Sequence, residues 1–174
     1  DALAAGFDGG GQVITGTPSY FVVRKNFPAA TLKGYIAFAK ANADKVTMAH
    51  AGVGSSTHLA CVYFEILTGI KTTAVAYRGN GPAMNDLVAG QIDGLCDLAP
   101  TAAPQVTAKT IRALMVALPE RAAATPDVPT SAEAGLPEYL FSGWNAMFAP
   151  QGTPKRVADT LATALQQALA DQPV

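Results

Sequence analysis

The residue types best suited to chemistry in this sequence lie in one short stretch, 51–58 (AGVGSSTH). Its glycines let backbone approach a ligand closely, and three hydroxyl side chains follow at the expected start of a helix. A helix N-terminus offers unpaired N–H groups and the positive end of the helix dipole, which suits an anion. Gly54, Ser55, Ser56 and Thr57 are therefore candidate ligand-binding residues. The same residues would also serve as an ordinary helix cap, and the sequence leaves both interpretations open.

A second turn, 77–83 (YRGNGPA), has the same logic with fewer hydroxyl groups. Its candidate ligand-binding residues are Arg78, Gly79, Asn80 and Gly81. Asp97 ends a later expected strand and is placed either to face the ligand or to cap the next helix. In open α/β sheets ligands bind outside the carboxyl ends of strands, so we expect these turns to meet at one edge.

Two kinds of enzyme chemistry could use residues of the first turn. A serine there, with His58 and Asp97, supplies the residue types of a hydrolase triad, but the G-x-S-x-G motif is absent. A phosphate-binding loop is excluded, because Ser55 stands where lysine must follow Gly54, and no G-x-G-x-x-G motif is completed. We expect no catalytic residue and no cofactor.

The cysteines raise the question of a metal. His58 and Cys61 lie three residues apart and could approach an ion together with Cys96 or Asp97. Buried, unreactive cysteines explain the same pattern, so we expect no metal site. With only two cysteines we also predict no disulfide framework.

Composition limits the class of protein. The 174 residues are 49% apolar and 14% charged, with a formal net charge of −1. Such a chain buries a sizeable core and offers no basic surface for nucleic acid. No apolar run approaches the roughly 20 residues that span a bilayer.

Strands and helices are expected to alternate along the chain. Expected strands lie at 19–25, 45–50, 72–77, 92–98, 111–118 and 144–149. Expected helices lie at 31–43, 56–69, 82–90 and 102–107, with a short one capped at 130–133 and a long one from 154. This order is typical of an α/β fold with a mostly parallel sheet flanked by helices.

Four ordered segments carry a family resemblance: 32–64, 75–100, 111–139 and 143–165, which include AGVGSSTHLACVYF, VAYRGNGPAMNDLVAGQIDGLCDLAP, IRALMVALPERAAATPDVPTSAEAGLPEY and GWNAMFAPQGTPKRVADTLATAL. Together they resemble the tripartite tricarboxylate transporter receptors, the Bug family of extracytoplasmic solute-binding proteins. The resemblance implies a periplasmic, two-lobed binding protein of the type II class. Such proteins capture a small organic acid between the lobes, deliver it to membrane components of a transporter and catalyse nothing.

The resemblance also implies a domain organisation. Residues 1–18 would be a flexible lead-in, 19–25 a first hinge strand, 26–118 the ligand-binding lobe, 119–143 a connection, and 144–174 a second hinge strand with an incomplete first-lobe helix. Family members are longer at both ends, so we expect part of the other lobe to be missing. We therefore expect this chain to self-associate through the apolar face of its last helix.

Overall fold

The computed structural model describes residues 7–8, 14–145 and 148–170. The chain divides into two compact units. The larger comprises residues 17–143, and the smaller combines 1–16 with 144–174. Each is described by itself below. None of the described helices has the length and apolarity needed to cross a bilayer.

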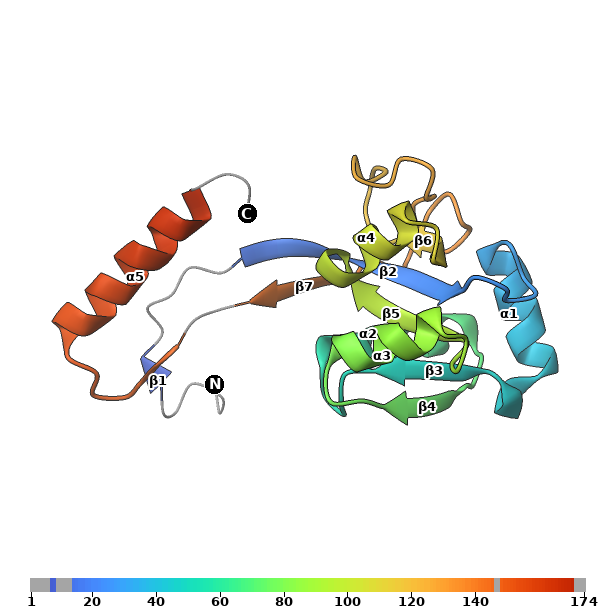
Figure 1. Ribbon diagram of the computed structural model, residues 1–174, viewed down its shortest axis with the longest axis horizontal. Coiled ribbons are helices and arrows are strands. Elements are labelled where there is room, and N and C mark those ends of the chain that lie inside the picture. The colour runs from blue at the N-terminus through green and yellow to red at the C-terminus, as the bar shows by residue number, and fades with distance from the viewer. Residues whose placement is uncertain (1–6, 9–13, 146–147, 171–174) are drawn as a thin grey trace. The chain divides into compact units, whose positions relative to one another are not determined.

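A mixed sheet forms the centre of the larger unit. Its strands are β2 (Ile14–Arg24), β3 (Thr47–His50), β4 (Thr73–Ala76), β5 (Gly94–Leu98) and β6 (Ile111–Val116), in the order β4-β3-β5-β2-β6, with β7 (Ser142–Asn145) also pairing with β2. β3 is parallel to β4 and β5, while β2 is antiparallel to β5 and β6. Strands β3 to β6 thus share one direction, and β2 runs against them (Figure 1). The predicted α/β fold is confirmed.

Helices cover both faces of this sheet. They are α1 (Leu32–Ala41), the 3₁₀ turn η1 (Ala43–Lys45), α2 (Ser56–Thr68), α3 (Asn80–Val88) and α4 (Ala99–Thr107). Side chains of β2 alternate between two buried clusters, Phe21 and Val23 in one, Tyr20 and Val22 in the other. The first cluster contains residues of α1 and α2, and the second contains residues of α3 and α4. A sheet buried on both faces explains the apolar strands seen in the sequence.

Most helices begin and end near the capping residues that the sequence predicted. Thr31 caps α1 by accepting a hydrogen bond from Gly34 N at 3.1 Å. Gly69 ends α2 in a left-handed conformation that glycine adopts without strain. Helix α3 begins two residues before Pro82, the residue expected to start it.

Residues 119–143 belong to the larger unit. The short helix predicted within them is absent from the structure, which describes all of these residues. Thr130 Oγ1 accepts from Glu133 N at 3.1 Å, and Glu133 Oε2 accepts from Thr130 N at 2.8 Å, which are the reciprocal bonds of the expected capping box. The segment nevertheless forms turns, not the predicted helix. Gly135, with φ of 88°, leaves the helical conformation two residues after Glu133.

The two predicted hinge strands, 19–25 and 144–149, have other bounds in the structure. The first begins at Ile14, so residues 14–18 form strand where a flexible lead-in over 1–18 was expected, and Phe7–Asp8 also form a strand. The rest of that lead-in, residues 1–6 and 9–13, lies outside the described residues. The second is split: Trp144 belongs to β7, and Ala149 belongs to β8.

The described residues of the smaller unit form one strand pair and one helix. β1 (Phe7–Asp8) pairs antiparallel with β8 (Ala149–Pro150), and α5 covers Lys155–Ala170. Val157 and Leu161 on α5 are exposed. Self-association through this face stays a prediction.

Candidate functional site

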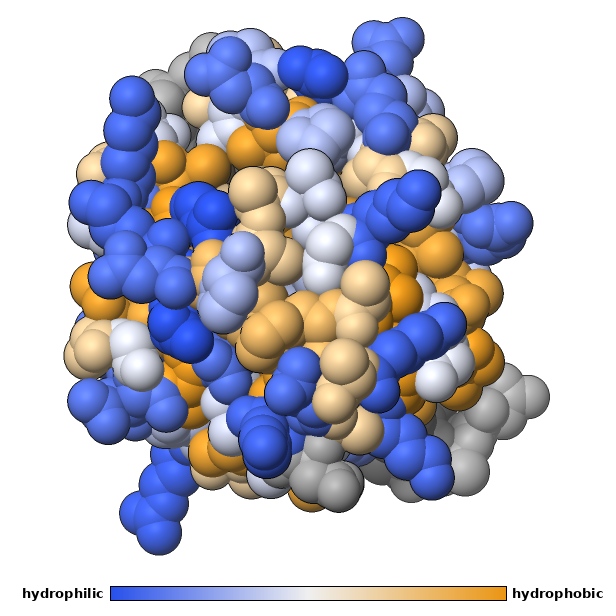
Figure 2. Space-filling view, turned by 90° about the vertical axis from the view of Figure 1, so that its right-hand side faces the viewer, coloured by the Kyte–Doolittle hydropathy of each residue, from blue (hydrophilic) through white to orange (hydrophobic). Residues whose placement is uncertain are grey.

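The two turns and the end of β5 meet at one edge of the sheet. Because β4, β3 and β5 are parallel neighbours, their last residues Ala76, His50 and Leu98 lie at the same edge. Tyr77 N donates to His50 O at 2.9 Å, which places the first two turns side by side. Helix α1 lies at the opposite end of the sheet (Figure 1). That end is seen in Figure 2, where hydrophilic side chains are scattered among apolar ones.

In the first turn, Ser55 and Thr57 hold the backbone. Ser55 Oγ accepts from His58 N at 3.2 Å, as the N-cap of α2, and donates to Gly52 O at 2.7 Å. Thr57 is buried, and its Oγ1 accepts from Ala51 N at 2.9 Å. These hydroxyl groups therefore organise the turn.

Ser56 differs from its neighbours. It is exposed, and among the described residues nothing hydrogen-bonds to its hydroxyl group. The N–H groups of Ser56 and Thr57 are the first two of α2, where a helix supplies no acceptor. Gly54, two residues before Ser56, is exposed and has a φ of 81°. At the start of α2, the open donors are thus on Ser56 and Thr57.

The second turn is hydrogen-bonded to strand β5. Gly79, with φ of 109°, is the N-cap residue of α3, and Asn80 follows as its first residue. Asn80 Nδ2 donates to Asp97 Oδ1 at 2.6 Å. Arg78 and Gly81 are exposed, and no hydrogen bond or ion pair occupies the Arg78 guanidinium within the described parts of the chain. Arg78 is therefore the cation available at this edge.

Asp97 serves as an internal support. Its side chain is fully buried, and Oδ2 accepts from Thr101 Oγ1 of α4 at 2.5 Å. Burial raises the pKa of this carboxyl group, and the bond from Thr101 partly opposes that shift. The carboxylate thus joins α4 to the turn at Asn80.

The residues of the hydrolase alternative do not form a relay in the described structure. Ser55 donates its hydroxyl proton to a backbone carbonyl, and His58 Nδ1 accepts from Gly54 N at 3.2 Å. Asp97 is bonded to Asn80 and Thr101 instead of an imidazole. The three side chains therefore make bonds other than those of a catalytic triad.

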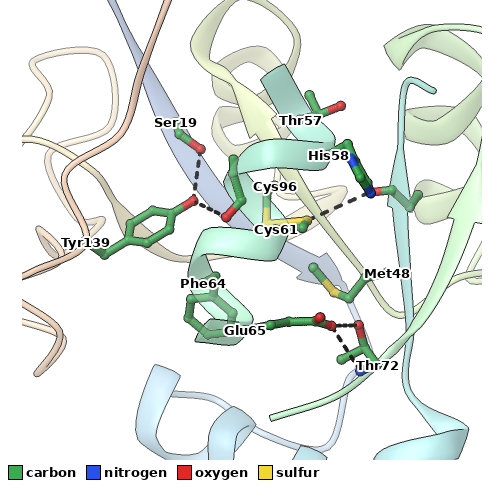
Figure 3. The surroundings of a disulfide bond; sticks show 12 residues. Ser19, Met48, Thr57, His58, Cys61, Phe64, Glu65, Thr72, Cys96 and Tyr139 are labelled. Atoms are coloured by element: carbon green, nitrogen blue, oxygen red, sulfur yellow. Dashed lines mark hydrogen bonds between the residues drawn. A yellow bond between two sulfur atoms is a disulfide. The ribbon is translucent and has the colours of Figure 1, made fainter. Parts of the chain in front are cut away.

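The prediction that the two cysteines form no disulfide is wrong. Cys61 of α2 and Cys96 of β5 form a disulfide with a Cα–Cα distance of 5.5 Å (Figure 3). Their sulfurs are therefore unavailable to a metal, and no cluster of potential ligands exists among the described residues. Nothing in the sequence pairs two cysteines 35 positions apart, because the contact arises when α2 packs on β5.

Residues 11–174 match the Tripartite tricarboxylate transporter family receptor. The chain belongs to this family. It is 38% identical over 159 residues to the UPF0065 protein in the TAR-I ttuE-ttuC' intergenic region of Agrobacterium vitis, covering 91% of this chain and 46% of that protein. The receptor chain thus spans about half the length of this relative.

Two solved structures with bound ligands are similar to this chain. MatC from Rhodopseudomonas palustris, with bound malate, has a TM-score of 0.91 and 34% identity over 95% of this chain and 56% of MatC. Another R. palustris protein, with adipate, has a TM-score of 0.87 and 30% identity over 96% of this chain and 56% of its own. Both ligands are dicarboxylates.

Proposed function

We propose that this receptor chain binds one carboxylate group of a small organic acid at the edge formed by the two turns and the end of β5. The observation that supports this most is the set of open donors at the start of α2, at the same edge of the sheet as the exposed cation Arg78. Charge-assisted hydrogen bonds of this kind are stronger than neutral ones. The malate and adipate bound by similar proteins fit the same chemistry.

The chain's place in a transport system follows from this proposal. The intact protein would act in the periplasm and deliver its ligand to the membrane components of a tripartite transporter. The Cys61–Cys96 disulfide supports that compartment, because disulfides persist in oxidising environments and are rare in the cytosol. Strands β2 and β7 cross between the two units, which supports their proposed role as hinges.

Calorimetry of malate and adipate binding tests the proposed site. Ser56→Ala removes a hydroxyl group and should weaken binding about tenfold, as expected for a hydrogen bond to a charged group of about 1.5 kcal/mol. Arg78→Ala should weaken it as well and reduce its dependence on salt. Lys33→Ala is the matched control, because it removes one exposed charge from α1 at the opposite end. Equal losses in all three variants would contradict the assignment.

A further inference from the structure

Two imidazoles hold the turn before α2. His50, the last residue of β3, is buried, and its Nδ1 accepts from Gly52 N at 3.2 Å. His58, in the first turn of α2, accepts from Gly54 N at 3.2 Å, also through Nδ1. The two ring centroids are 4.5 Å apart. Each histidine therefore holds one glycine of the same turn.

These glycines need an external restraint. Gly52 and Gly54 have φ values of 118° and 81°. Glycine populates positive and negative φ about equally, so its own backbone preference does not hold it in this conformation. No atom would lie within 4 Å of a Cβ at Gly54, so packing does not fix that residue. The bond to His58 supplies the restraint that packing lacks.

The choice of acceptor suits an anion site. An imidazole nitrogen that accepts a hydrogen bond carries no proton, so both rings are neutral Nε2–H tautomers in this structure. A carboxylate at either position would accept the same N–H group but would place a negative charge beside the ligand. Neutral imidazole holds the turn without that repulsion.

We propose that His50 and His58 are positioning residues, which orient the turn so that the open N–H groups of Ser56 and Thr57 point at a ligand carboxylate. This inference rests on the proposed function of the same edge. A turn held in its binding geometry before the ligand arrives loses less conformational freedom on binding. His58 lies on α2 one turn before Cys61, and the disulfide holds that part of the helix on β5 (Figure 3).

Three substitutions of His58 separate acceptor position from acceptor charge. Asn places its Oδ1 where the imidazole Nδ1 lies, Gln moves its acceptor one bond further out, and Asp keeps the position but adds a negative charge. Amide exchange at Gly54 should stay slow in His58→Asn and His58→Asp and accelerate at least tenfold in His58→Gln. Equal exchange in Asn and Gln variants would overturn the role of Nδ1.

Malate affinity in the same variants tests positioning. His58→Asn should bind within about threefold of the original chain, His58→Gln about tenfold more weakly, and His58→Asp more than tenfold more weakly although its turn is intact. Unchanged affinity in His58→Gln, with fast exchange at Gly54, would overturn the positioning role. If the original chain binds no carboxylate, the proposed function fails, whereas the exchange data still decide whether His58 holds the turn.

Discussion

Removing the Cys61–Cys96 disulfide should lower the free energy of unfolding by about 3 to 4 kcal/mol, because the bond closes a long loop in the unfolded chain. The double substitution Cys61→Ala/Cys96→Ala makes this change without leaving a lone thiol. Both cysteines are buried between α2 and β5, so the two alanines also leave a small space in the core. Urea unfolding followed by circular dichroism measures the difference.

Reducing agent provides the control for the disulfide. It should lower the urea midpoint of the original chain toward that of the double variant and leave the variant unchanged. A double variant as stable as the oxidised chain would show that the disulfide adds nothing to the larger unit.

Tyr139→Ala should destabilise the larger unit by about 3 to 5 kcal/mol, the range for loss of a large buried aromatic ring. Tyr139 is fully buried and lies 5.9 Å from the Phe64 ring and 5.6 Å from the Tyr63 ring, measured between centroids. Its hydroxyl group donates to Ala60 O at 3.3 Å (Figure 3). Burial also raises the pKa of Tyr139 to about 12. The ring joins segment 119–143 to α2.

Two further variants show how much of the loss comes from the buried ring. One removes only the hydroxyl group, and the other changes the exposed neighbouring residue. Tyr139→Phe should cost only about 1 to 2 kcal/mol, because it keeps the ring and removes the hydrogen bonds of its hydroxyl group to Ala60 O and Ser19 Oγ. Leu140→Ala changes the neighbouring residue, which is 63% exposed, and should cost less than about 0.5 kcal/mol. Similar losses for Tyr139→Ala and Leu140→Ala in urea unfolding would contradict the packing described.

Local signals in the sequence were enough to predict α1 and α2. The hydroxyl groups of Thr31 and Ser55 and the glycine at position 69 act on the adjacent backbone, so the helix ends could be read without tertiary contacts. The position of β2 in the sheet could not be predicted from local signals. Its antiparallel insertion between β5 and β6 depends on pairing partners more than 60 residues away, such as Leu95 opposite Val22.

The candidate site was predicted as a set of turns, but the roles within it were not. Ser55, Ser56 and Thr57 are equivalent in the sequence, whereas the structure gives the first and third internal bonds and leaves Ser56 open. Asp97 likewise faces the interior, because Asn80 and Thr101 surround it. Such roles depend on which backbone groups the fold brings near each hydroxyl or carboxylate.

Backbone amide chemical shifts during a malate titration locate the site directly, and they respond even to weak binding. The largest changes should appear at Ser56 and Thr57, with further changes at residues 78–81, because these N–H groups lie at the shared edge of β3, β4 and β5. Residues of α1, at the opposite end of the sheet, should not move. Shifts confined to α1, or none at Ser56 and Thr57 at saturating malate, would contradict carboxylate binding at this edge.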